Sequence, residues 1–123
     1  MVLHIASHSF TPVFNGRTRR VDVGLLYDPG REVEKRFCRT WRRKIIRHCE
    51  PDGEWRVLSN SPYQGKSDGV PAYLRTLFPQ RYIGIELELN QYWHLEQYKR
   101  WQILCADLID SLRETLSAFE MHV

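Results

Sequence analysis

The chain is poor in cysteine, and the cysteines it has form no recognisable pair. Its 123 residues include three cysteines, an odd number, without a CxxC motif. A disulfide framework is therefore not expected, and a reducing cytoplasm is the expected location. Cys38, Cys49 and Cys105 each fall at an apolar position of a helical pattern. We interpret them as unreactive thiols that pack in the core.

Long apolar runs and a strong net charge are also absent. No stretch of about 18 apolar residues occurs, so no membrane span is expected. The start, MVLHIASHSF, lacks the charged and apolar regions of a secretory signal, and none is expected. The net charge is +3, from 18 basic and 15 acidic residues. This mildly basic balance does not by itself indicate a nucleic-acid partner, and we do not expect one.

The remaining composition is that of an ordinary globular domain. Hydrophobic residues make up 42% of the chain and charged residues 27%, which is enough for a core and too apolar for a disordered chain. The length suits one domain. Because neither an internal repeat nor a long linker divides the sequence, residues 1–123 are predicted to form a single domain.

Strand-like and helix-like segments alternate along the chain. Strands are predicted over residues 2–7, 21–27, 55–58 and 82–89, and helices over about 31–49, 72–78 and 91–119. Asn15-Gly16 is a strong turn signal. The alternation predicts an α/β fold with a largely parallel sheet.

Two of the predicted helices are amphipathic. Asp28 and Pro29 are the predicted N-cap and first-turn residue of the first helix, and Pro51-Asp52-Gly53 is predicted to end it. Its predicted buried stripe comprises Val33, Phe37, Trp41, Ile45 and Cys49. The stripe of the C-terminal helix comprises Trp101, Cys105, Leu108, Leu112, Leu116 and Phe119, with Ile109 beside it.

His8 is the first candidate for chemistry, because it is predicted to lie where a strand meets a loop. Ligand sites of open α/β sheets lie at the carboxyl ends of strands, so this position suits a metal ligand or a base. A loop histidine bonded to backbone is the alternative. His4 is interpreted as structural, because four residues of a strand span roughly 13 Å, too far for both histidines to bind one zinc.

Glu86 and Glu88 are the second candidate. They share one face of the predicted strand over residues 82–89, with backbones roughly 6–7 Å apart. Two carboxylates beside an apolar sheet favour a polar pocket, where one pKa rises and acid–base work becomes possible. The alternative is a solvated face. The loop over residues 60–69 is a weaker signal, in which Tyr63 offers a phenolic donor and Lys66 a positive charge.

A third feature is the strongly basic surface of the first helix. Its cations are Arg36, Arg39, Arg42, Arg43, Lys44 and Arg47. Such a helix can lie on phosphates, or it can simply be a solvated face whose charge suits the helix dipole.

Four sequence blocks in this order, HSFTPVFNG, RVDVGLLYD, NSPYQGKSDG and GIELELNQ, resemble the N-formylglutamate amidohydrolase family, which is distantly similar to the zinc carboxypeptidases. The match covers roughly residues 2–91, and the whole chain resembles the C-terminal half of such a catalytic domain. The resemblance implies a three-layer α/β/α fold of the phosphorylase/hydrolase-like kind, with a mostly parallel or mixed sheet that this half leaves incomplete. It also implies hydrolysis of an amide or formamide bond in an N-acyl amino acid such as N-formylglutamate.

The resemblance also implies a single zinc ion and roles for particular residues. His8, followed by Ser9, matches a zinc ligand, and Glu88 matches the general base. Zinc lowers the pKa of a bound water to near 7, and a nearby carboxylate takes the proton as that water attacks. A catalytic zinc needs about three protein ligands, with the other ring nitrogen of a ligating histidine donating to a neighbour.

The substrate-binding positions follow from the same resemblance. Asn90 stands where the relatives have an arginine that contacts substrate, and Tyr63 matches their mobile tyrosine. Arg20 resembles a position that meets a substrate carboxylate. Glu86 is also predicted to be a substrate-binding residue.

One departure from the family leaves three interpretations open. The other two zinc ligands of the family lie upstream of the HSFTP block, whereas here only seven residues precede His8. The chain is a fragment, or it completes its site with a second subunit, or it no longer catalyses. His48, His94 and Asp68 are the remaining candidates for substitute ligands. The second hypothesis is therefore a non-catalytic interaction module that binds a partner through the basic helix or an exposed sheet edge.

Overall fold

A mixed four-stranded sheet forms the centre of the molecule. The computed structural model describes residues 1–49, 55–66 and 69–120; Pro51-Asp52-Gly53 and Asp68 lie outside these ranges. The strand order is β1-β6-β4-β5. The strands are β1 (Val2–Phe10), β4 (Val23–Leu26), β5 (Val57–Ser59) and β6 (Tyr82–Asn90). β1 pairs with β6 and β4 with β5 in parallel, whereas β4 runs antiparallel to β6.

Two of the three strand pairs are parallel and one is antiparallel, which confirms the prediction of a mostly parallel or mixed sheet. The connection between β1 and β4 contains only the hairpin of β2 (Val13–Phe14) and β3 (Arg17–Thr18). Parallel neighbours need a long crossover, usually a helix, and this connection has none, so β4 returns in the opposite direction. The hairpin turns at Asn15-Gly16, where both residues have positive φ, as predicted from that dipeptide.

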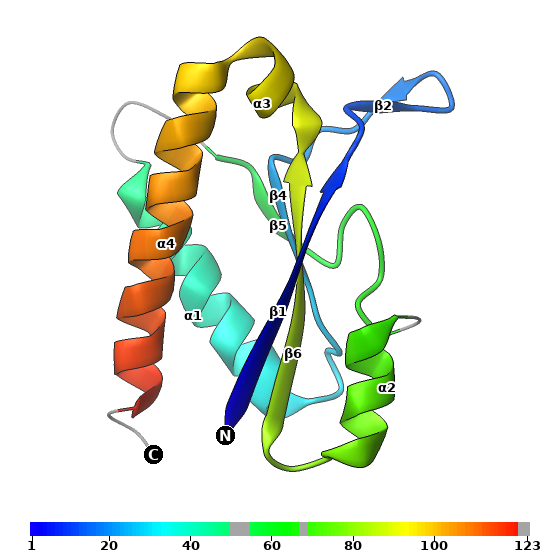
Figure 1. The fold of residues 1–123 in the computed structure, drawn as a ribbon, viewed down its shortest axis with the longest axis vertical. Helices are drawn as coiled ribbons and strands as arrows, with labels where there is room; N and C mark the ends of the chain where they lie inside the picture. The colour runs from blue at the N-terminus through cyan, green and yellow to red at the C-terminus, as the bar shows by residue number, and fades with distance from the viewer. Residues whose placement is uncertain (50–54, 67–68, 121–123) are drawn as a thin grey trace.

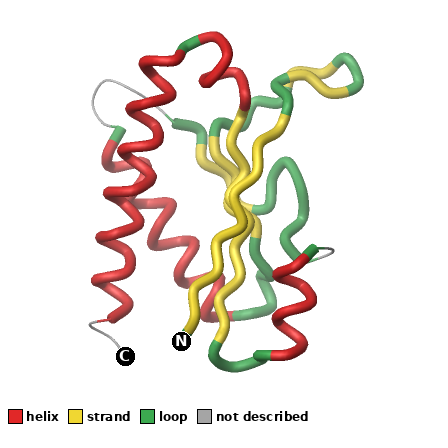
Figure 2. The backbone as a smooth tube through the Cα atoms, in the orientation of Figure 1, coloured by secondary structure: helices red, strands yellow, loops and turns green. Residues whose placement is uncertain are grey.

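Helices cover both faces of the sheet (Figures 1 and 2). α1 (Glu32–His48) and α4 (Tyr98–Glu120) lie on one face, and α2 (Val70–Leu77) lies on the other. The three layers confirm the predicted α/β fold class. No helix in the described part of the chain is both long enough and apolar enough to span a membrane.

The core lies between the sheet and the pair α1 and α4. Ile83, Ile85, Leu87 and Leu89 alternate along β6 and belong to this cluster, as the period of two predicts. Phe37, Trp41 and Ile45 face them from α1, each at most 1% exposed. The predicted stripe of this helix is confirmed at these positions, while Val33 is only half-buried and Cys38 is fully buried.

The start of α1 differs from the prediction. Arg31, not Asp28, is the N-cap residue, and it makes no side-chain capping bond. Asp28 accepts a hydrogen bond from the backbone N–H of Gly30 (2.9 Å), which closes a local turn before the helix begins. Pro29 therefore lies outside the first helical turn.

The predicted helix over residues 91–119 is two helices. α3 (Gln91–Glu96) ends at Gln97, whose φ of −141° and ψ of 64° are not helical, and α4 follows. The buried face of α4 also differs, because Leu104, Ser111 and Thr115 are fully buried. Ile109 is 52% exposed.

Ser111 and Thr115, the polar residues on the buried face of α4, both form hydrogen bonds. Ser111 accepts a hydrogen bond from the Trp41 indole (3.0 Å) and donates to the Leu108 carbonyl, and Thr115 donates to the Ser111 carbonyl. A hydrophobicity pattern places such residues outside, whereas hydrogen bonds to the preceding turn allow their burial.

A buried ion pair completes the free edge of β6 beyond the end of β4. The Glu34 carboxylate, 0% exposed, accepts hydrogen bonds from the backbone N–H of Gly84 (3.1 Å) and from Arg75 Nε (3.0 Å). Arg75 donates to the carbonyls of Gly84 and Gly65. Arg31 bonds Glu34 and the Tyr82 carbonyl. These charged groups take the place of a neighbouring strand.

The three cysteines are free thiols, as predicted. Cys38 and Cys49 are buried and Cys105 is half-buried. Burial raises the pKa of Cys38 and of Cys105 above its usual value, which keeps both thiols protonated and unreactive.

Candidate functional site

The register of β1 against β6 places His8 beside Glu88. The two residues are Cα partners in the parallel pair, and Ala6 and Phe10 pair with Glu86 and Asn90. β1 continues to Phe10, so His8 lies within the strand. The prediction that His8 lies where a strand meets a loop is therefore wrong. Pairing with β6 through Asn90 holds the polar residues His8 and Ser9 extended. His8 is exposed, on the sheet face opposite α1 and α4.

Glu88 is the buried carboxylate of this group, with only 6% of its surface exposed. Burial raises its pKa above the usual value, and the nearby Glu86 carboxylate raises it further, while His8 and Arg19 lower it. A carboxyl group with a raised pKa binds a proton more strongly, which suits a general base. We call His8, Arg19, Tyr63, Glu86 and Glu88 the His8–Glu88 cluster.

The loop over residues 60–65 lies on the same sheet face. Gly24, the β4 partner of Glu88, has no side chain, and a Cβ there would overlap the Ser61 carbonyl oxygen. Gly24 therefore allows the loop to approach the backbone of β4 directly. Asn60 fastens the loop, because its side-chain oxygen accepts hydrogen bonds from the backbone N–H groups of Tyr27 (3.1 Å) and Gly65 (3.0 Å).

Tyr63 in this loop meets Arg19 from the segment after the hairpin. Arg19 Nη1 donates to the Tyr63 hydroxyl at 2.8 Å. The guanidinium carbon lies 5.1, 5.0 and 5.6 Å from the ring centres of Phe10, Phe14 and Tyr63. Nε and Nη2 donate to the carbonyl and hydroxyl oxygens of Thr11. Since a guanidinium has five N–H donors, two of them remain for a ligand after these three bonds to described residues.

The two other residues predicted to bind substrate are Arg20, which lies on the surface, and Asn90, which is buried. Arg20 is exposed, and Arg19 is the arginine of this segment that acts on Glu88. Asn90 is 5% exposed. Its amide donates to the Val21 carbonyl (2.9 Å), and its oxygen accepts from the Tyr92 N–H at the start of α3. Asn90 thus fastens the chain at the end of β6.

Glu86 and His4 occupy the same sheet face as Glu88. Glu86 is half-buried, and its carboxylate oxygen lies against Gly69 at the start of α2. His4 Nδ1 forms a hydrogen bond of 2.7 Å with the Tyr82 hydroxyl, in agreement with a structural role. Lys66 is exposed.

Zinc is the predicted cofactor, but the described residues do not supply a complete set of ligands for it. Within residues 1–49, 55–66 and 69–120, no three His, Cys, Asp or Glu side chains come together to hold a metal ion. His48 contacts Glu114 (2.8 Å) and His94 packs on Tyr98 and Trp101, so neither joins His8. The described residues of one chain therefore do not fit a complete zinc site.

The sequence contained a signal for Arg19 that the prediction did not use. The Asn15-Gly16 turn fixes the hairpin register, in which Phe14 pairs with Arg17, and the Arg19 N–H then bonds the Pro12 carbonyl. Residues two apart on a strand share a face. Arg19, and not Arg20, therefore lies on the face of Phe14. For the ion pair of Glu34 and Arg75, 41 residues apart, we find no such signal.

Comparisons with known proteins show the fold. No family model matches the chain, and no curated protein matches it. A crystal structure, that of gene product Atu2144 from Agrobacterium tumefaciens, is similar with a TM-score of 0.61 and 25% sequence identity. The similarity covers 94% of this chain and 43% of that chain. This chain thus spans less than half the length of the solved protein it resembles.

Proposed function

We propose that this chain contributes the base and the substrate-binding residues of a hydrolase that cleaves the amide bond of an N-acyl amino acid. The observation that carries the proposal is the in-register pairing of His8 with Glu88, whose carboxyl group is buried and has a raised pKa. The four sequence blocks that resemble N-formylglutamate amidohydrolases meet around this pair, which supports the same conclusion.

Glu88 is proposed as the general base. In this role its carboxylate takes a proton from water while the water oxygen bonds to the acyl carbon. The proton then passes to the amine nitrogen as the C–N bond breaks. Glu86 lies two residues away on the same face and raises the pKa of Glu88, so its proposed role is to tune the base.

Arg19 is proposed to bind the carboxylate of the substrate. Its guanidinium is oriented by Thr11 and Tyr63 and flanked by three aromatic rings, which fixes its plane before a ligand arrives. The free N–H groups of an oriented guanidinium match a carboxylate. This proposal gives to Arg19 the role that the family resemblance implies for Arg20.

His8 is proposed as one zinc ligand, with the further ligands supplied by a second subunit. The support is its exposed position on β1, which lies at an edge of the sheet. The predicted cytoplasmic location is part of the same proposal.

Zinc content of the purified protein tests the proposal. We expect about one zinc per chain by elemental analysis, and release of formate from N-formyl-glutamate. His8→Ala should lose both, because a ligand is removed. His48→Ala is the matched control, since His48 bonds Glu114 on the other side of the sheet, and it should keep both. Folded wild-type protein that binds no zinc and hydrolyses neither N-formyl nor N-acetyl amino acids would contradict the proposal.

Replacing Arg19 tests the carboxylate site. Arg19→Gln is expected to raise KM for N-formyl-glutamate about tenfold or more, because a charged hydrogen bond is lost. The change should be much smaller for a substrate whose carboxylates are amidated. Arg20→Gln is the control. An equal rise in KM for both substrates, or an effect confined to Arg20→Gln, would show that Arg19 does not bind the carboxylate.

A further inference from the structure

Positive charge is concentrated on α1. The helix spans 17 residues, EVEKRFCRTWRRKIIRH, and holds seven of the 18 lysines and arginines against two acidic residues. Glu86 and Glu88 lie on the opposite side of the sheet. The net charge of +3 therefore conceals an uneven distribution, and the charge of the whole chain is a poor guide to what this face binds.

Four arginines form a row along α1. Arg36, Arg39, Arg43 and Arg47 follow one another at intervals of three, four and four residues, so they share a face with neighbours roughly 5–6 Å apart. All four are exposed. Among the described residues, none of the four forms an ion pair. Glu114 on α4 bonds Lys44 and His48, and, within the part of the chain that the structure describes, Glu32 is the one acidic side chain that lines a hollow beside the row.

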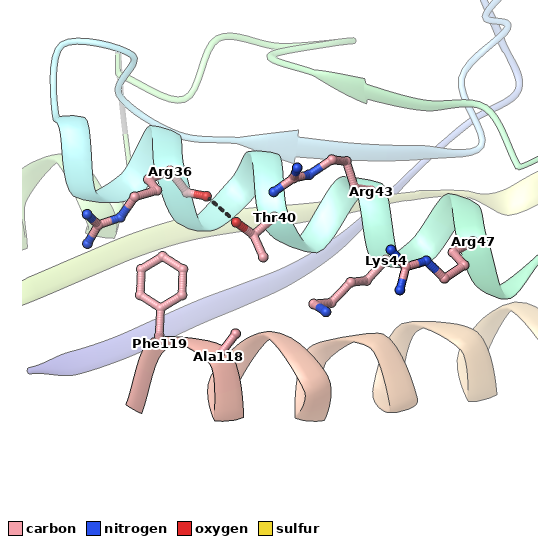
Figure 3. A pocket seen from close by; sticks show the side chains of 7 residues that line it. All are labelled: Arg36, Thr40, Arg43, Lys44, Arg47, Ala118 and Phe119. Atoms are coloured by element: carbon pink, nitrogen blue, oxygen red, sulfur yellow. Dashed lines mark hydrogen bonds between the residues drawn. The ribbon is translucent and has the colours of Figure 1, made fainter. Parts of the chain in front are cut away.

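Two hollows meet along this row. One, of about 460 Å³, lies between α1 and the end of α4, with Ala118 and Phe119 opposite the cations (Figure 3). The other, of about 700 Å³, lies on the opposite flank of α1 and ends at Leu58 and Ser59. Arg36 and Arg43 line both hollows, so the row forms the ridge between two basic depressions.

The lining of the hollows favours phosphate over protein as the bound group. Guanidinium groups bind both phosphates and carboxylates. A protein partner, however, needs a buried apolar anchor at the centre of its interface. Among the residues that the structure describes, the first hollow offers apolar side chains only at Ala118 and Phe119. Nucleic-acid interfaces are more polar and more positive. The row also extends over roughly 16 Å of helix axis, which exceeds the reach of a single phosphate.

We propose that this face of α1 binds the backbone of a single-stranded nucleic acid, with the four arginines contacting successive phosphates. Phe119 supplies an aromatic surface at the end of the row, where its ring lies 5.2 Å from the Arg36 guanidinium. Unpaired bases stack on such rings, and a charged groove beside them tracks the backbone. This activity is independent of the hydrolase proposal, since it uses none of the residues of the His8–Glu88 cluster.

Fluorescence anisotropy of a labelled 20-nucleotide oligo-dT, with the full chain at 50 to 200 mM KCl, tests the proposal. With four phosphate contacts, log K should fall against log salt with a slope of about −2.8, which weakens binding about 50-fold over this range. The variant Arg39→Gln, Arg43→Gln, Arg47→Gln leaves one contact of the row, so its slope should be about −0.7. Unchanged circular dichroism will show that this variant is folded.

The control variant removes the same charge elsewhere. Arg17→Gln, Arg81→Gln, Arg113→Gln changes three exposed arginines outside α1 and should keep the wild-type slope within about 0.7. No binding at 50 mM KCl, or equal loss in both triple variants, would overturn the proposal. Equal displacement of the oligonucleotide by poly-glutamate would also overturn it, since the face would then bind acidic polypeptides.

Discussion

Glu34→Gln is expected to lower the free energy of unfolding by roughly 3–5 kcal/mol, because it leaves two guanidinium groups without their anion in the interior. Arg75 is 8% exposed, and the Arg31 side chain is 17% exposed. The glutamine amide would also place an N–H donor where the carboxylate accepts hydrogen bonds from the Gly84 N–H and from Arg75 Nε. Urea unfolding followed by circular dichroism measures the change.

Glu32→Gln is the control for this loss. Glu32 lies in the same first turn of α1 but is exposed, so its substitution should change stability by no more than about 0.5 kcal/mol. The double variant Glu34→Gln, Arg75→Gln should be less unstable than the sum of its single variants, because the two side chains are in direct contact. A loss below about 1 kcal/mol in Glu34→Gln would mean that water or a rearranged side chain replaces the carboxylate.

Glu88→Ala is expected to lower kcat for N-acyl amino acids by roughly 10²–10⁴-fold while leaving the zinc content unchanged, because the proposed base is removed and the proposed ligand is kept. Glu86→Ala should be milder, since Glu86 acts only on the pKa of Glu88. Steady-state kinetics and elemental analysis of the same preparations check both statements. Full activity of Glu88→Ala would exclude Glu88 as the base, and equal losses in the two variants would mean that the carboxylates act as a unit.

Glu88 also predicts a pH dependence of stability, which can be measured without an activity assay. Because burial raises the folded-state pKa of Glu88, the native protein binds more protons than the unfolded chain between the unfolded and folded pKa values. Stability therefore falls as pH rises through that interval. Unfolding in EDTA should show this loss in wild type but not in Glu88→Gln, with exposed Glu96→Gln as the control. Parallel stability curves for wild type and Glu88→Gln would contradict the assigned shift.

Local patterns were sufficient for the elements whose packing is regular. The alternation of Ile83 to Leu89 predicts β6 and its buried face, because one face meets a continuous apolar layer. The spacing of Phe37, Trp41 and Ile45 predicts α1 for the same reason. The same β6 pattern places Glu86 and Glu88 together, which is the part of the candidate site that the sequence predicts directly.

Predictions failed where a tertiary partner decides the outcome. Ser111 and Thr115 turn inward because Trp41 and the preceding turn of α4 bond them, and the predicted stripe of α4 is displaced as a result. β1 extends through Phe10 because β6 pairs with it. Arg75 is buried because Glu34 on another helix neutralises it. None of these partners lies within the range of a local pattern.

The strand register of β1 and β6 makes the His8–Glu88 cluster sensitive to chain length as well as to residue type. His8 faces the cluster only because it is paired with Glu88. Inserting or deleting one residue in β1 ahead of His8 would turn the imidazole toward α4. An insertion would bring Ser7 to its place, and a deletion would bring Ser9. Every candidate group would still be present in the sequence, yet the pair would no longer exist. The spacing within β1 therefore matters to the pair as much as the histidine itself.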